Sequence, residues 1–215
     1  FTIEEIIGPA GFSPGTPVQS CANAANPVNA PHIRQLIDAG AIPVARTNSS
    51  ELCIRPHTDN PLFGATINPW NRNISPGGSG GGDAVAVATG MSPLGTGNGY
   101  NGSTRIPAQF CGVTSIKSTS GRVASYNATL PFAHSLAMQL FFSQGPVART
   151  VRDLRLVLDS TSSYDIRDPH WRAAPPCTFP AEKPAKIGIA ADPGMDDAAR
   201  RTIETAAEFL LDAGY

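Results

Sequence analysis

The chain has 215 residues, of which 41% are hydrophobic and only 15% are charged, with 16 Lys and Arg against 17 Asp and Glu. This composition is typical of a globular enzyme and excludes a disordered segment. The net charge of −1 provides no basic surface, so no nucleic-acid partner is expected. No apolar run reaches the roughly 20 residues that span a bilayer, so no membrane partner is expected either.

The cysteines and the first residues indicate where the protein is located. Cys21, Cys53, Cys111 and Cys177 are too far apart to form a CxxC pair, which argues against a zinc knuckle. Their wide spacing favours reduced thiols in a cytoplasmic protein. The opening run FTIEEII contains acids and no basic segment, which excludes a signal peptide. We expect a cytoplasmic protein that needs neither a metal nor an organic cofactor.

Strand and helix patterns alternate over the first 45 residues. FTIEEII has the character of a short strand. Residues 31–40 predict a helix that ends at Gly40, because Ile33, Leu36 and Ile37 recur at helical spacing. The run AIPVAR, residues 41–46, is a short apolar segment typical of a buried strand. This order predicts a βαβ unit in a parallel sheet.

The middle of the chain is rich in glycine and proline. Residues 56–82 form a predicted loop, after which Asp83 is a candidate N-cap for a helix of small residues. Residues 112–124 predict a strand followed by a turn. A further helix is expected near residues 151–160, where Val151, Leu154 and Val157 form an apolar stripe that Leu156 and Leu158 widen.

The last 55 residues contain a polar, proline-rich stretch, a strand and a helix. The run KIGIAADPG predicts a buried strand, and the residues after it predict a long capped helix. A further parallel strand would be needed to complete a βαβ unit at this point. We therefore expect residues 1–215 to be a piece of a larger fold, completed by a missing C-terminal half or a companion chain.

Two nucleotide-binding interpretations of the glycine-rich loops are considered. Gly97, Gly99 and Gly102 match the spacing of a dinucleotide fingerprint, but the flanking residues do not predict the strand and helix that it requires. The run SPGGSGGGDA could hold a phosphate at the start of a helix. It lacks the lysine of a Walker loop, since no lysine lies between Arg72 and Lys117.

A third interpretation treats Ser79 and Ser103 as a pair. A nucleophilic serine needs a base within hydrogen-bond reach and backbone N–H donors for the developing oxyanion. Glycines next to a serine let the backbone turn tightly and present such donors. The alternative is that both loops are ordinary turns, which glycine-rich segments commonly form.

The order of several motifs resembles the amidase signature family. The matching runs are NPWNRNISPGGSGGGDAVAVATG, then GTGNGYNGSTRIPAQFCGVTSIKSTSGRV, with GAIPVARTNSSEL, NPLFGATINPW, GPVARTVRDL and YDIRDP elsewhere in the chain. The resemblance implies an α/β/α sandwich around a large mixed, twisted sheet, incomplete in this chain. It divides residues 1–215 into a catalytic-loop core at 1–160, a polar proline-rich loop at 161–185, and a strand and helix at 186–215 that begin the C-terminal half.

The family hydrolyses amides with a Ser–cis-Ser–Lys triad, and the resemblance assigns roles by position. Ser103 matches the nucleophile, and Ser79 matches the bridging serine that follows a cis peptide bond. Backbone N–H groups around Tyr100, Asn101 and Gly102 would form the oxyanion hole. Cys53 matches a region that contacts substrate in relatives. The implied substrate is a small-molecule amide, and a homo-oligomer is a further option for the assembly.

The sequence departs from the family at the position of the catalytic lysine, which Glu4 occupies. A carboxylate has a reference pKa of about 4.3 against about 10.4 for lysine, so it is a much weaker base. Its negative charge would also oppose an alkoxide forming nearby. Other departures are Gly80, Gly99, Asn101 and Ser118. Two hypotheses follow: an amidase with altered proton handling, or a silenced homologue that acts as a binding or assembly component.

Histidine-based catalysis is the remaining chemical alternative. His57 lies close to Asp59 and is the best of the four histidines, while His32 is expected on the polar side of the first helix. His134 and His170 lie in apolar or loop contexts. Nothing in the sequence pairs any of these residues with Ser103, so a structural role is favoured for each.

Overall fold

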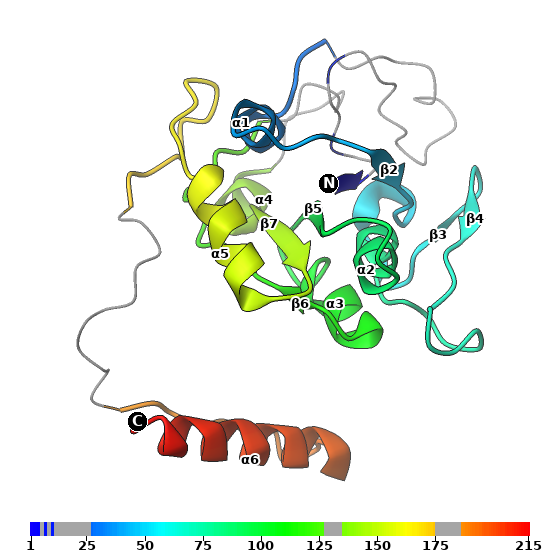
Figure 1. The fold of residues 1–215 in the computed structure, drawn as a ribbon, viewed down its shortest axis with the longest axis vertical. Coiled ribbons are helices and arrows are strands. Elements are labelled where there is room, and N and C mark those ends of the chain that lie inside the picture. Colours follow the sequence, from blue (N-terminus) through cyan, green and yellow to red (C-terminus); the bar gives the residue numbers. More distant parts are fainter. Residues whose placement is uncertain (5–6, 8–9, 11–26, 127–134, 175–185) are drawn as a thin grey trace. The chain divides into compact units, whose positions relative to one another are not determined.

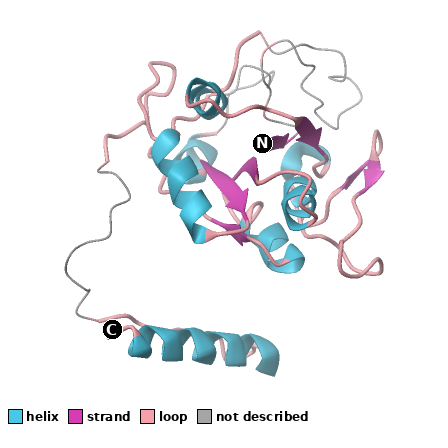
Figure 2. Ribbon diagram, in the orientation of Figure 1, coloured by secondary structure: helices cyan, strands magenta, loops and turns pink. Residues whose placement is uncertain are grey.

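The computed structural model describes residues 1–4, 7, 10, 27–126, 135–174 and 186–215 (Figure 1). The chain divides into two compact units, Phe1–Cys177 and Thr178–Tyr215. The first unit contains a mixed sheet with helices, and the second contains one long helix (Figure 2).

The sheet of the first unit has the strand order β2-β1-β5-β7-β6. Its strands are β1 (Thr2–Glu4), β2 (Ala45–Thr47), β5 (Leu94–Gly99), β6 (Thr114–Ser115) and β7 (Ser143–Ala148). β1 runs parallel to β2 and β5, whereas β7 is antiparallel to β5 and β6. The predicted α/β class with a mixed sheet is confirmed. So is the βαβ unit, in which α1 (Pro31–Asp38) connects β1 to β2, although the second strand covers Ala45–Thr47 and is not the buried strand expected at residues 41–46.

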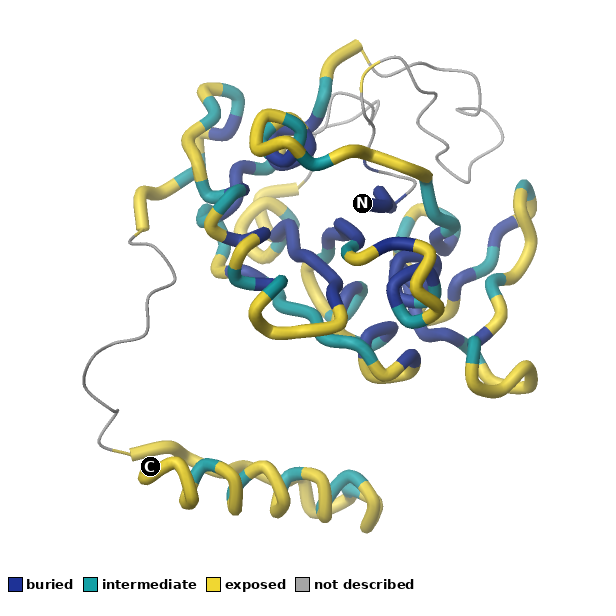
Figure 3. Tube along the Cα trace, viewed as in Figure 1, coloured by how far each residue is buried: buried dark blue, intermediate teal, exposed yellow. Residues whose placement is uncertain are grey.

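Side-chain alternation along β1 directs different residues to the two faces of the sheet. Phe1 and Ile3 pack with Ile33 and Leu36 of α1 and with Val157 of α5 (Val151–Ser160). A second apolar cluster lies where α2 (Gly81–Ala88) meets α3 (Arg105–Cys111) and β7, and contains Ala84, Val87, Cys111 and Val147. Thr2 and Glu4 therefore face α2, and Figure 3 shows how thoroughly α2 is buried.

A short hairpin and two small helical elements complete the described part of the first unit. The hairpin pairs β3 (Asp59–Asn60) with β4 (Gly64–Ala65) in antiparallel register. The Asn60 side chain stabilises its turn by accepting hydrogen bonds from the backbone N–H groups of Leu62 and Phe63, at 3.0 and 2.9 Å. The 3₁₀-helix η2 (Glu51–Cys53) precedes the hairpin, and α4 (Leu136–Phe141) precedes β7.

Several local predictions were wrong, each because tertiary packing overrides the local pattern. Asp83 is not the N-cap of α2: the helix begins at Gly81, and Asp83 is buried in its first turn, where Thr2 binds it. Leu156 does not widen the apolar stripe of α5, because it is 68% exposed. His32 is only 3% exposed rather than on a polar face, because α1 packs against the sheet and α5.

The segments on either side of Gly97, Gly99 and Gly102 also differ from expectation. β5 contains the first two of these glycines and α3 follows the third, although the sequence pattern indicated neither element. Gly97 lies within β5, and a Cβ atom there would approach Thr104 Cγ2 to 2.9 Å and Glu4 Oε2 to 3.1 Å. This glycine therefore makes room for the side chains of Thr104 and Glu4, which is a structural role that requires no dinucleotide.

The second unit contains α6 (Asp197–Asp212). Asp196 caps it by accepting hydrogen bonds from the N–H groups of Ala198 and Ala199, both at 2.9 Å. The helix at this position is confirmed, but the strand expected just before it is absent: residues 186–196 contain no strand. A strand needs a neighbour for its backbone hydrogen bonds, and in this segment Ile187 and Ile189 remain exposed.

Candidate active site

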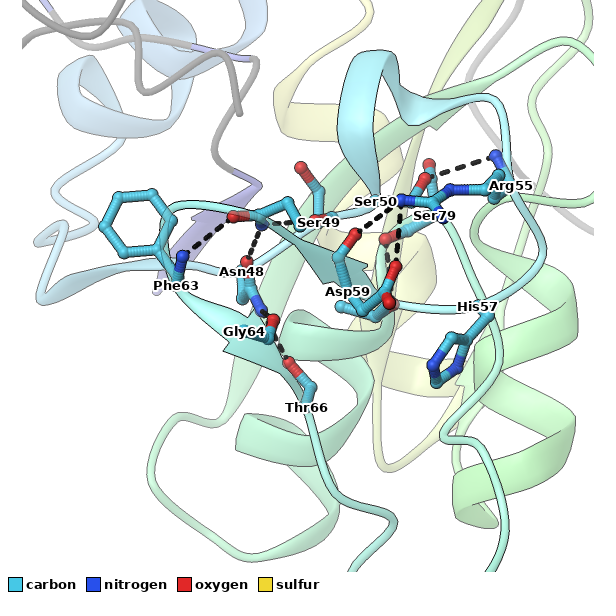
Figure 4. Close-up of polar contacts among 12 residues, drawn as sticks. Asn48, Ser49, Ser50, Arg55, His57, Asp59, Phe63, Gly64, Thr66 and Ser79 are labelled. Carbon is cyan, nitrogen blue, oxygen red and sulfur yellow. Dashed lines mark hydrogen bonds and ion pairs between the residues drawn. The ribbon is translucent and has the colours of Figure 1, made fainter. Parts of the chain in front are cut away.

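The glycine-rich loop before α2 presents Ser79 to the strand β1. The Gly78–Ser79 peptide bond is cis, which agrees with the expectation drawn from the family resemblance. Ser79 is buried, and its hydroxyl donates a hydrogen bond to Glu4 Oε1 at 3.0 Å. The loop is anchored from outside by the N–H group of Ser50, which donates to the Ser79 carbonyl at 3.2 Å. Figure 4 shows Ser79 beside Ser50.

Glu4 is the polar centre of the site and is completely buried. Its Oε2 accepts a hydrogen bond from the N–H group of Asn98 at 3.0 Å, and its Oε1 accepts from the Cys53 thiol at 3.5 Å as well as from Ser79. Burial raises the pKa of this carboxyl to about 7, and the hydrogen bonds from Asn98, Ser79 and Cys53 oppose that rise. Desolvation disfavours the ionised form, so the negative charge expected from the sequence is only partly present near neutral pH.

Ser103 lies on the turn that connects β5 to α3 and is half-buried. Its carbonyl accepts a hydrogen bond from the N–H group of Gly80 at 3.1 Å, so the two serine-bearing loops are joined by their backbones. Among the residues that the structure describes, the Ser103 hydroxyl has no hydrogen-bond partner. Catalytic hydrogen bonds are often long in ligand-free structures, so this geometry is compatible with a nucleophile.

The three residues proposed for the oxyanion hole form the exposed rim of the same turn. Tyr100 is 42% exposed, Asn101 is exposed and Gly102 is half-buried. The Arg105 guanidinium donates to the Asn101 carbonyl at 2.5 Å, which ties the turn to the first residue of α3. The role of these N–H groups stays a prediction.

Cys53 lies next to the Ser79–Glu4 pair. Both Leu52 and Cys53 have positive φ angles, of 53° and 56°, and this unusual turn directs the thiol toward Glu4. Burial, followed by the nearby Glu4 charge, raises the pKa of the Cys53 thiol well above its usual range. Cys53 and Cys111 are free thiols, whereas Cys21 and Cys177 lie outside the described residues. The predicted contact between Cys53 and substrate stays a prediction.

The sequence reasoning missed a second buried carboxyl group, that of Asp83. The Thr2 hydroxyl donates to Asp83 Oδ1 at 2.6 Å, while Oδ2 is buried without a partner among the described residues. Burial raises the pKa of Asp83 to about 7, the hydrogen bond from Thr2 opposes the rise, and the Glu4 charge adds to it. The acid at this position after three glycines was visible in the sequence, but it was interpreted only as a helix cap.

Among the described residues, no histidine side chain forms a hydrogen bond with Ser79 or Ser103. His57 Nδ1 lies 2.7 Å from Ser75 Oγ, and Asp59 forms its ion pair with Arg55 at 2.9 Å rather than with His57 (Figure 4). Burial lowers the pKa of His32 to about 3, which keeps it neutral. His134 lies outside the described residues, and His170 lies 3.0 Å from Gln139 Oε1.

Metal-binding clusters and membrane-spanning helices are both lacking from the part of the chain that the structure describes. Within the described ranges, no group of three or more His, Cys, Asp or Glu side chains is placed to hold a metal ion. None of the helices between the gaps in the description combines the length and apolar content needed to cross a bilayer.

The buried carboxyls predict an unusual pH dependence of stability. Because the pKa of Glu4 is about 7 in the folded state, above its ordinary 4.5, the folded protein holds this proton more tightly than the unfolded chain. Its contribution to the free energy of unfolding is complete below about pH 4.5 and is lost as the pH rises to about 7. Glu4→Gln is expected to be no more stable than the wild type at about pH 4 and about 3 kcal/mol more stable at about pH 8.

Urea unfolding of both proteins across this pH range measures the difference. The comparison also removes the opposing effect of His32, whose lowered pKa reduces stability on acidification in both proteins equally. A difference that does not change between about pH 4 and about pH 8 would contradict the assignment of a raised pKa to Glu4.

Taken together, the fold and the site define an α/β protein in which two glycine-bordered serine loops meet at a buried strand carboxyl group. The family model described as Amidase matches residues 13–215. The chain therefore belongs to the amidase family.

Its relatives include enzymes that act on amides. The chain is 41% identical over 192 residues to the indoleacetamide hydrolase of Bradyrhizobium japonicum, covering 88% of this chain and 41% of that one. It is 40% identical over 142 residues to one of the subunits of the Glutamyl-tRNA(Gln) amidotransferase of Methanosarcina acetivorans, covering 66% of this chain and 29% of that one. The chain thus spans about two fifths or less of the length of these relatives.

Solved structures show the same fold. The structure of 6-aminohexanoate cyclic dimer hydrolase complexed with substrate matches with a TM-score of 0.70 and 29% identity, over 90% of this chain and 39% of that one. A chain from a vestigial protein complex related to the origins of an s-triazine catabolic enzyme matches with a TM-score of 0.73 and 31% identity. That match covers 80% of this chain and 37% of the other.

Proposed function

We propose that this protein hydrolyses the C–N bond of a small carboxamide, with Ser103 as nucleophile, Ser79 as proton relay and Glu4 as base. Ser103 Oγ forms a bond to the carbonyl carbon while its proton moves to Ser79 Oγ, and the Ser79 proton moves to Glu4 Oε1. The N–H groups of Tyr100, Asn101 and Gly102 stabilise the oxyanion. The C–N bond then breaks, the amine leaves with the relayed proton, and water releases the acid by the same route.

The observation that carries this proposal is the hydrogen bond from Ser79 to Glu4 Oε1 at 3.0 Å in a water-excluded site. A general base works best when its pKa lies near the working pH. Burial raises the pKa of Glu4 to about 7, which makes its carboxylate a stronger base than an exposed one. The backbone link between Gly80 and Ser103 supports the proximity of the nucleophile to this relay.

The substrate class and the assembly are also part of the proposal. Relatives named as an indoleacetamide hydrolase and a cyclic dimer hydrolase support an amide substrate. Because the chain spans about two fifths of such relatives, we propose that a further C-terminal half or a companion chain completes the substrate pocket. Cys53 would contact the substrate from the η2 turn. Homo-oligomer formation and a cytoplasmic location stay predictions.

A silenced homologue that binds or assembles without turnover is the second candidate function. The observation that favours it is the carboxyl group of Glu4 at the position of the family's lysine, held in hydrogen bonds with Ser79, Cys53 and Asn98. A carboxylate adds negative charge close to the alkoxide that would form on Ser103, which a neutral lysine would not do.

Covalent labelling of Ser103 by a fluorophosphonate decides between these functions. We expect one equivalent of label on Ser103, detected by intact mass and peptide mapping, and none on Ser103→Ala. The rate should rise about tenfold per pH unit up to about pH 7 and then level off, because Glu4 must be ionised to accept the proton. Folded protein that remains unlabelled at all pH values would support the silenced homologue, particularly if Glu4→Lys acquired amide hydrolysis.

A further inference from the structure

The hydroxyl group of Thr58 makes three contacts with the backbone of the Ser79 loop. Thr58 is completely buried just before β3. Its Oγ1 donates toward the carbonyl oxygens of Gly77 and Ser79, at 2.8 and 3.0 Å, and accepts a hydrogen bond from the N–H group of Gly81 at 2.9 Å. A hydroxyl has one proton and two lone pairs, so one proton is shared by the two carbonyls.

These contacts surround Ser79 on both sides along the chain. The two carbonyl oxygens belong to the residue before the Gly78–Ser79 peptide and to Ser79 itself, and the Gly81 amide opens α2. A Cβ atom on residue 81 would collide with Thr58 Oγ1, so the close approach of the hydroxyl requires glycine there. Thr58 thus links the hairpin segment to the first turn of α2.

The side chain of Ser79 is held separately from its backbone. Among the described residues, its hydroxyl donates to Glu4 Oε1, at 3.0 Å. The direction of the hydroxyl therefore depends on how the surrounding backbone is held. Ser50 N–H also binds the Ser79 carbonyl, but at 3.2 Å and without contact to Gly77 or Gly81. Thr58 is the side chain whose hydroxyl reaches all three of these backbone groups.

We propose that Thr58 is a positioning residue that holds the hydroxyl of Ser79 in place between Ser103 and Glu4. The inference rests on the proposed function for its catalytic consequence, but the contact between Ser79 and Glu4 that it controls can be measured separately. Removing the hydroxyl takes one partner from two carbonyls and one amide in a buried site; the Ser79 carbonyl keeps the Ser50 N–H at 3.2 Å, while the groups of Gly77 and Gly81 must shift to find other partners. A displacement of about 1 Å in a catalytic group can lower a rate about a hundredfold.

The test compares Thr58→Val, which keeps the shape and removes the hydroxyl, with Thr58→Ser, which keeps the hydroxyl. Thr89→Val is the matched control, because its hydroxyl binds the Val85 carbonyl at the far end of the same helix. The first measurement is the rate of Ser103 labelling by a fluorophosphonate. We expect Thr58→Val to label about a hundredfold more slowly, and Thr58→Ser and Thr89→Val to stay close to the wild type.

The second measurement is the titration of the Glu4 carboxyl by carbon-13 NMR, which requires no catalysis. The Ser79 hydrogen bond lowers the pKa of Glu4, so its loss in Thr58→Val should raise that pKa toward the value in Ser79→Ala. A wild-type labelling rate together with an unchanged Glu4 titration in Thr58→Val overturns the proposal. If the wild type does not label, the proposed function fails, and the Glu4 titration alone decides the role of Thr58.

A variant that does not fold leaves the test intact. Should Thr58→Val lose its far-ultraviolet circular dichroism, Thr58→Cys replaces it, because a thiol has a similar size and is only a weak donor. The same two measurements and the same criteria then apply to that variant.

Discussion

Glu4→Gln is expected to lower the rate of Ser103 acylation by about 10²- to 10⁴-fold, the usual contribution of a positioned general base. In the proposed reaction, the amide cannot accept the proton that Ser79 passes on, although it has nearly the shape of the carboxyl group. The rise of the rate with pH up to about 7 should also disappear, because no group of the relay titrates in that range any longer. Fluorophosphonate labelling across this pH range measures both effects.

Asp83→Asn is the matched control for this experiment. Asp83 is also a buried acid with a pKa raised to about 7, but its hydrogen bond is to Thr2 and not to Ser79. It should retain labelling, with the pH profile displaced to lower pH because one negative charge near Glu4 is removed. Equal rates for Glu4→Gln and the wild type would show that another group takes the proton.

Gly145→Ala is expected to destabilise the protein by about 4 kcal/mol or more, which is a large part of the roughly 5–15 kcal/mol free energy of unfolding of a typical domain. Gly145 lies in β7, opposite Gly97 of β5, and β7 also pairs with β6. An added Cβ atom would overlap the backbone carbonyl oxygen of Ile116. A backbone atom next to the β6–β7 ladder cannot move away as the end of a flexible side chain can, so the sheet itself must distort.

Urea unfolding at fixed pH measures this change, with soluble expression as a first indication. Gly188→Ala is the control, because a Cβ atom there meets nothing within 4 Å. It should alter the free energy of unfolding by no more than about 0.5 kcal/mol, as most surface changes do. A small effect of Gly145→Ala would indicate that β6 can separate from β7 without loss of the fold.

Glu4→Gln connects function with stability in one residue. The variant is expected to be more stable above about pH 7 and much less active over the same range. Both effects have the same cause, since Glu4 is buried without water around its charge. The cost of ionising a buried carboxyl is what raises its pKa into the range where it can act as a base. Under the proposed function, a site of this kind favours activity over maximal stability.

The sequence determined the parts of this protein that depend on local pattern and composition. Helical spacing located α1 and α5, the capped run after residue 194 indicated α6, and the order of strand and helix patterns predicted the parallel pairing of β1 with β2. The run of motifs around Ser79 and Ser103 indicated the amidase family, which the family match then showed. Glycine, proline and serine spacing carries this information because tight turns restrict which residues can occupy them.

Tertiary structure alone decided the chemistry of the site. Whether Glu4 carries a charge depends on its complete burial and on donors from Ser79, Cys53 and Asn98, which lie 49 to 94 residues away in the chain. Asp83 is a buried acid and not the expected helix cap, because the hydroxyl of Thr2 on a neighbouring strand donates a hydrogen bond to it. The strand expected in the run KIGIAADPG, residues 186–194, is absent, because a strand forms only beside a partner. Desolvation and hydrogen-bond pairing are properties of neighbours in space, and no local pattern encodes them.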